Sequence, residues 1–194
     1  AGRIETLSIN LPSGSLLPSS LLTSIARPAD LWLSIDGRSA YVLDQQTARV
    51  VAFRIDTLSG GLIALGSATN LVGSPTRLVS AQPFDLLHIF PGLTMLALDP
   101  LTRQALPIDV DPKTGLLTAT LNYVADLPLG TQSIGVVEGV GFNDVLLSAS
   151  DDGASGQLAS FQRDDTAQVW VPVDTVALGR GPLAIAKRPR LVAP

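Results

Sequence analysis

One stretch of the sequence decides the fold: Val50-Val51-Ala52-Phe53-Arg54-Ile55-Asp56-Thr57-Leu58-Ser59-Gly60-Gly61-Leu62. It has the pattern of an alternating apolar strand that ends in an aspartate, then a short Ser-Gly turn and a second strand. Residues 4–16 and 106–116 repeat this pattern, and residues 158–164 hold a weaker copy. The residues that end the first strand of each copy lie 46, 55 and 53 residues apart: Asn10, Asp56, Asp111 and Asp164.

A second feature follows each of these turns at a nearly constant distance. Pro28, Pro75 and Pro182 lie 18 or 19 residues after the preceding turn residue, and each opens an apolar strand. After Asp111 the equivalent place falls at residues 130–133, which contain no proline. Two features with one shared period indicate stacked copies of a single structural unit.

The second copy shows what one unit contains. We expect strands at residues 30–34, 39–43, 49–55 and 62–66, joined by short turns. Four antiparallel strands within about 45 to 55 residues are typical of one blade of a β-propeller. The stretch 16–25 is the best helix candidate, but its alignment with a connection between strands argues against a helix.

The same residues resemble a known family. Pro28-x-x-Leu31-x-Leu33-Ser34-Ile35-Asp36-Gly37-Arg38-x-x-Tyr41-Val42, followed by the 50–62 stretch, is similar to a blade of the lactonase-type propellers. That family includes 6-phosphogluconolactonase-like and surface-layer YVTN-type proteins. The resemblance is strong over residues 28–65, fair over 1–27 and 140–186, and poor over 75–130. It implies a ring that normally has seven blades, of which this chain supplies a little over half.

We therefore expect an all-β chain of about four four-stranded antiparallel blades, part of a larger seven- or eight-bladed ring. The chain divides into outer strands, three blades and one inner strand: 1–27, 28–74, 75–130, 131–181 and 182–194. Three arrangements remain open. The chain is a piece of a longer polypeptide, or another copy or another chain completes the propeller, or it closes as a four-bladed ring. The start at Ala1 rather than Met fits a removed leader or an excised segment.

The composition limits the partners. There are only two Glu and two Lys against fifteen Asp and eleven Arg, which places the acids in turns rather than on helices. With a net charge of −4, nucleic acid is not an expected partner, and the basic segment 187–190 is expected to be a solvated tail. No apolar run is long enough for membrane insertion, and no cysteine is present for a disulfide or a thiolate metal site.

Candidate chemistry is sparse. His88 is the only histidine and the one candidate catalytic residue. The family resemblance implies histidine, arginine and glutamate around a central channel, but the histidine-bearing motif at the start of a blade is missing, so no other position is assigned. Residues 109–115 are superficially similar to a calcium loop but lack its later oxygen ligands, which favours a turn. The segment 150–156 is expected to be a hairpin, and no metal or cofactor site is expected.

Aromatic residues are expected on strands, where large rings fill the space between blades. These are Trp32, Tyr41, Phe53, Phe161 and Trp170. The function we expect is a non-catalytic module for protein–protein interaction or scaffolding, periplasmic or extracellular in a bacterium. The alternative is a lactonase-type hydrolase of a sugar or aromatic lactone, with its catalytic residues largely outside this chain and His88 as the first residue to test.

Overall fold

The structure is a computed structural model, which describes residues 2–22, 24–34, 36–80, 95–111, 113–119, 124–138, 144–164, 166–167, 169–180 and 185. Fifteen strands and no helix occur in these ranges, in agreement with the all-β prediction. In the described part of the chain there is accordingly no helix long and apolar enough to cross a membrane. The chain forms two compact units, Ala1–Leu78 with Val110–Ala119, and Val79–Asp109 with Thr120–Pro194.

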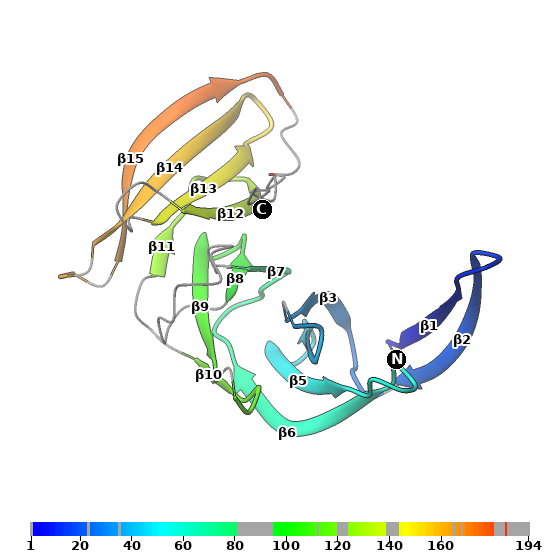
Figure 1. Ribbon diagram of the computed structural model, residues 1–194. Coiled ribbons are helices and arrows are strands. Elements are labelled where there is room, and N and C mark those ends of the chain that lie inside the picture. Colours follow the sequence, from blue (N-terminus) through cyan, green and yellow to red (C-terminus); the bar gives the residue numbers. More distant parts are fainter. Residues whose placement is uncertain are drawn as a thin grey trace, which may run out of the picture. The chain divides into compact units, whose positions relative to one another are not determined.

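The first unit holds one complete blade (Figure 1). Its four antiparallel strands pair in sequence order: β3 (Pro28–Leu33), β4 (Ser39–Asp44), β5 (Arg49–Ile55) and β6 (Leu62–Asn70). The predicted third strand, 49–55, is confirmed to the residue, whereas β3 begins two residues before the expected start. Its core contains Ile25, Ala40, Val42 and Phe53, because alternate side chains of β4 and β5 point to the same face.

A separate two-stranded sheet precedes this blade. It is the hairpin of β1 (Ile4–Asn10) and β2 (Ser15–Leu22), so the stretch considered as a helix is largely a strand. Ile4 and Leu22 pack against the core of the β3–β6 blade. The backbone N–H of Gly2 donates to Ala26 O at 2.8 Å, and Ser19 donates to Ser59 O. The hairpin is thus attached to the blade that follows it.

The second unit contains the other complete four-stranded run. Its strands are β12 (Thr131–Glu138), β13 (Asp144–Asp151), β14 (Gly156–Asp164) and β15 (Val169–Leu178). The predicted hairpin at residues 150–156 joins β13 to β14. Beyond β15 the sheet continues through β11 (Val124–Asp126), β9 (Gln104–Val110) and β8 (Met95–Asp99).

The third repeat departs most from the expected pattern. Its first strand, β7 (Arg77–Ser80), is short, and the place of its fourth strand holds two short strands, β10 (Leu117–Ala119) and β11. β11 pairs with β9 in antiparallel and with β15 in parallel orientation. This is the part of the chain where the family resemblance is poorest.

The outer strand pairs share an irregularity. The register shifts once in each of three pairs, always three to five residues before the turn residue of that repeat. The shifts fall between Thr6 and Leu7, between Val51 and Phe53, and between Ser160 and Phe161. A bulge at a constant place bends each outer strand in the same way, which supports the reading of the chain as copies of one unit.

Candidate functional site

His88, the candidate catalytic residue, lies outside the described residues, and so does the basic segment 187–190. The role of His88 therefore stays a prediction. The described residues that bear on function lie in the turns, among the buried polar groups and on the exposed faces of the sheets.

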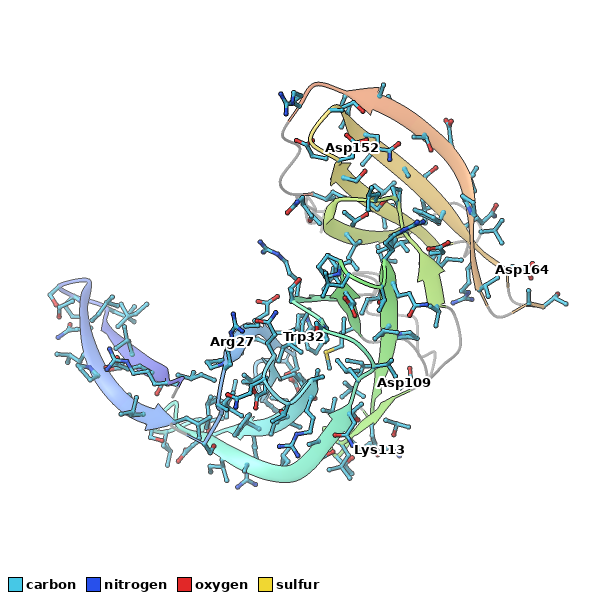
Figure 2. The ribbon with its side chains drawn as sticks, turned by 180° about the vertical axis from the view of Figure 1, so that it is seen from behind. Arg27, Trp32, Asp109, Lys113, Asp152 and Asp164 are labelled. Carbon is cyan, nitrogen blue, oxygen red and sulfur yellow. The ribbon has the colours of Figure 1, made fainter. Side chains whose placement is uncertain are left out.

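Among the residues that the structure describes, eight aspartates stabilise turns through one shared contact, in which a carboxylate oxygen accepts a hydrogen bond from the backbone N–H two residues later. These are Asp36, Asp44, Asp56, Asp99, Asp111, Asp151, Asp152 and Asp164. Figure 2 shows two of them, Asp152 and Asp164, at opposite ends of β14. The expectation that this chain places its acids in turns is confirmed for these residues.

The turn contacts lower the pKa of several carboxyls. At Asp111 the main cause is the hydrogen bond from the backbone N–H of Lys113, which favours the charged form. At Asp44 burial by itself raises the pKa, but the hydroxyl of Thr47 and backbone donors outweigh it. These carboxylates stay ionised at neutral pH and are occupied by their turns, which makes them poor groups for proton transfer.

Asp109 behaves in the opposite way. It lies half-buried on β9, two residues before Asp111, and burial raises the pKa of its carboxyl. A carboxyl of this kind becomes functional when it faces a cleft that also holds a partner group. Among the residues that the structure describes, no three His, Cys, Asp or Glu side chains come together to hold a metal ion. Sequence reasoning considered Asp109 only as part of a calcium loop, and no sequence signal marks its burial.

Backbone hydrogen bonds form the predicted turn after β9. The Asp111 N–H donates to Leu116 O at 2.9 Å, and the Gly115 N–H donates to Asp111 O at 2.8 Å. The hydroxyl of Tyr41, on β4, donates to Gly115 O at 3.3 Å. Tyr41 is fully buried, and burial raises the pKa of its hydroxyl. The residues 111–115 therefore form a packed structural turn.

The aromatic rings lie on strands, as predicted, and most of them are buried. Phe161 and Trp170 belong to a core cluster with Leu96, Leu98 and Ile134, which joins β8 to the β12–β15 blade. Trp32 packs on Tyr41 with ring centroids 5.3 Å apart.

Three polar groups in the same blade are buried without a hydrogen-bond partner among the described atoms: Ser148 Oγ, Ser150 Oγ and Trp170 Nε1. Buried polar groups are normally hydrogen-bonded, so each of these costs stability or binds water. Ser148 pairs with Ala159 across the sheet, on the face that carries the core. The two serine side chains therefore lie where the blade packs, and substitutions there test that packing.

The opposite face of the β12–β15 blade carries exposed and half-buried apolar side chains beside the polar Ser160, Gln162 and Asp174. We call this the open face; its apolar side chains are Leu147, Leu158, Val171, Val176 and Leu178. Val176 is 52% and Val171 43% exposed, although both lie on a regular strand. Their cross-strand partners are Leu158 and Gln162, on the side opposite to Phe161. Exposed apolar side chains that gather on one face are typical of surfaces that contact other protein.

Ile185 lies at the inner edge of the open face. Its N–H donates to Ser133 Oγ at 3.1 Å, and its Cγ2 lies 3.2 Å from the place that a Cβ on Gly135 would occupy. In the first unit, Leu78 N–H donates to Asp30 Oδ2 at 2.8 Å in the same way. In both cases a side chain on the first strand of one repeat accepts the hydrogen bond. The donor is the backbone N–H of the third residue after the proline of the next repeat. Ile185 therefore holds the position relative to β12 that Leu78 holds relative to β3.

The β1–β2 hairpin also carries exposed apolar side chains. Leu7 lies three residues before the turn residue Asn10, and its equivalents in the three later repeats are fully buried: Phe53, Ile108 and Phe161. Leu7 itself is 46% exposed, because the sheet of the hairpin contains only β1 and β2. Leu7, Ile9, Leu16 and Leu21 are exposed together; we call this side of the hairpin the hairpin face.

Comparison with known proteins identifies the fold as that of a partial β-propeller, and its structural neighbours include lactonase-type propellers. No family model matches the sequence, and no curated protein sequence matches it either. The chain spans about half the length of two of the solved propellers that it matches.

Three solved structures illustrate the likeness. The periplasmic gluconolactonase of Pseudomonas aeruginosa is 19% identical, with a TM-score of 0.58 over 86% of this chain and 43% of that one. A protein from Lactobacillus plantarum is 14% identical, with a TM-score of 0.60 over 94% of this chain and 51% of its own. Hydrazine synthase of Kuenenia stuttgartiensis is 11% identical, with a TM-score of 0.53 over 90% of this chain and 43% of its own. At these identities the likeness shows the fold alone.

Proposed function

We propose that this chain is a non-catalytic propeller module that binds other protein segments through its exposed sheet faces. The observation that carries the proposal is the open face, which exposes Val171 and Val176 and has Ile185 at its inner edge. Covering such a face with protein removes its apolar side chains from water, which is favourable in free energy. The setting we propose is the bacterial periplasm or the extracellular space.

Association through the open face tests this function. Val176→Asp places a charge in the middle of the face, and Leu101→Asp places the same charge at an exposed apolar residue in a turn of the same unit. Sedimentation over a wide concentration range should show association of the wild type and of Leu101→Asp, and its loss in Val176→Asp. Association that is equal in all three proteins would contradict the proposed function.

The second candidate function is a lactonase-type hydrolase of a sugar or aromatic lactone. It is supported by the structural likeness to a periplasmic gluconolactonase. His88 is the residue to test, with hydrolysis of glucono-1,5-lactone as the assay. Hydrolysis that falls strongly in His88→Ala would favour this function, whereas an equal rate in wild type and variant would exclude a role for His88.

A further inference from the structure

The fourth strands of the repeats differ in whether another strand covers their outer edge. In a propeller the fourth strand of each blade is the outermost, so its far edge lies at the perimeter wherever the chain begins and ends. β10 lies against β6, where the N–H of Leu117 donates to Ser67 Oγ at 3.1 Å, and β11 pairs with both β9 and β15. Among the described residues, no strand pairs with the outer edge of β2, or with that of β15 beyond Trp170.

A proline marks each of the two uncovered strands. Pro18 on β2 and Pro172 on β15 hold the same position in the repeat, since they pair with Leu7 and Phe161, each three residues before its turn residue. In both strands the residue after the proline is the extra one at the register shift. The equivalent position in β6 is Ala64, and neither β6 nor β11 contains a proline. Proline is therefore present where the outer edge is free and absent where it is covered.

The chemistry of these positions opposes the addition of a further strand. Proline lacks the N–H donor that an added strand would need, and it is found on edge strands and at bulges. The bulge beside it bends the strand out of regular register. On β15 the N–H of Thr175 also donates to Asp174 Oδ1 at 2.7 Å, so a side chain of the same strand occupies this donor. The stretch from Val171 to Thr175 thus offers few regular donors to a strand of another molecule.

Without these features both strands would be prone to pair with other chains. β2 reads Ser-Leu-Leu-Pro-Ser-Ser-Leu-Leu, and β15 reads Val-Trp-Val-Pro-Val-Asp-Thr-Val-Ala-Leu. β2 carries no charge, and Asp174 is the one charged residue of β15. Exposed strands that are rich in apolar residues, low in charge and free of proline are the ones that add strands and stack into fibrils.

We propose that Pro18 and Pro172 are edge guards, which keep the two uncovered outer strands from pairing with strands of a second copy of this chain. This inference goes beyond the proposed function and is independent of it, because it concerns the edges of the sheets and not their faces.

The test replaces each guard by valine, which restores the N–H donor on a residue that favours strands. Both prolines are exposed, so Pro18→Val and Pro172→Val should fold, and circular dichroism checks this. At neutral pH, well below the unfolding temperature, each variant should form thioflavin T-binding aggregates about tenfold faster than the wild type. Association through the open face is read by sedimentation and needs no dye-binding aggregate, so failure of one idea is distinguishable from failure of the other.

Controls separate the strand edge from the loss of a proline as such. Pro12→Val and Pro100→Val remove prolines from turns, and each loses a similar restriction of the unfolded chain. Pro172→Lys restores the N–H donor but places a charge on the edge, which opposes strand pairing. All three controls should aggregate at the wild-type rate.

Two results would overturn the proposal. The first is a wild-type rate of aggregation in both Pro18→Val and Pro172→Val. The second is a rate in Pro100→Val or Pro172→Lys as high as that in Pro172→Val, because lower stability of the fold, and not an opened edge, would then cause the aggregation.

Discussion

The hydroxyl of Tyr41 donates a hydrogen bond of 3.3 Å to the carbonyl oxygen of Gly115, which lies 74 residues later in the sequence. This contact fixes the turn of one repeat on the second strand of another. Tyr41→Phe should lower the free energy of unfolding by about 1 kcal/mol, because the buried carbonyl loses its donor. Urea denaturation measures the change, and an unaltered midpoint would show that the bond contributes nothing.

Gly115 itself offers a sharper test of the same packing. Its φ is +71°, and a Cβ there would lie 3.1 Å from Ser39 Oγ and 3.2 Å from Leu65 Cδ1. Gly14 has a φ of +69° with no atom within 4 Å of an added Cβ. Both Gly→Ala substitutions should cost about 1 kcal/mol of backbone strain, and Gly115→Ala should cost more. Equal losses in urea denaturation would mean that the turn is not packed as described.

The repeat pattern predicts most of the local structure because the same local chemistry recurs. The turn residues Asp56, Asp111 and Asp164 all accept a hydrogen bond from the backbone N–H two residues later, and this contact needs only nearby atoms. The strand 49–55 follows from residue alternation, and the argument against a helix at 16–25 follows from the alignment of the repeats. Such features are readable from sequence since they involve no distant partner.

Features that depend on distant packing could not be predicted in this way. Leu7 and Phe161 share one position in the repeat, yet one is exposed and the other buried, because only Phe161 has a complete sheet around it. The burial of Asp109 likewise depends on how β9 packs. Ala48 and Arg103 adopt φ values of +48° and +61°, which residues other than glycine rarely do, so no residue pattern predicts them.

The backbone conformation of Ala48 predicts that a substitution to glycine there stabilises the chain. It ends the turn between β4 and β5 with φ +48°, where a Cβ is unfavourable. Ala48→Gly should therefore raise the free energy of unfolding by up to about 1 kcal/mol. Ala167→Gly, in an exposed turn without positive φ, should be neutral or destabilising. Thermal unfolding distinguishes the two, and a loss of stability in Ala48→Gly would contradict the prediction.

Arg103 holds the equivalent turn position but also makes side-chain contacts. Its Nε donates to Leu127 O at 2.9 Å, and its guanidinium pairs with Asp126 at 3.3 Å. Arg103→Gly therefore removes the strain together with these contacts, and its net gain should be smaller than that of Ala48→Gly. A larger gain at Arg103 would show that its contacts do not stabilise the turn.

The unpartnered hydroxyl of Ser148 predicts that its removal is tolerated. Ser148→Ala should leave the free energy of unfolding unchanged or raise it by about 1 kcal/mol, because the hydroxyl has no partner among the described atoms. Thr131 is the contrasting buried hydroxyl, since its Oγ1 donates to Pro128 O at 2.7 Å. Thr131→Val should cost about 1 kcal/mol. A loss at Ser148 equal to that at Thr131 would mean that Ser148 binds a buried water.

Asp109 and Asp111 should affect stability with opposite signs as the pH changes. The pKa of Asp109 is raised in the folded chain, so its contribution is present below the unfolded pKa of about 3.9 and is lost as the pH rises through the folded pKa. Asp109→Asn should thus raise stability at pH 7, with no gain in acid. The pKa of Asp111 is lowered, so its contribution is present above the unfolded pKa and is lost as the pH falls through the folded pKa. Asp111→Ala should accordingly destabilise the chain at pH 7 and less so in acid. Urea denaturation of both variants from acid to neutral pH measures the two trends, and trends of the same sign would show that the pKa of Asp109 is not raised in the folded chain.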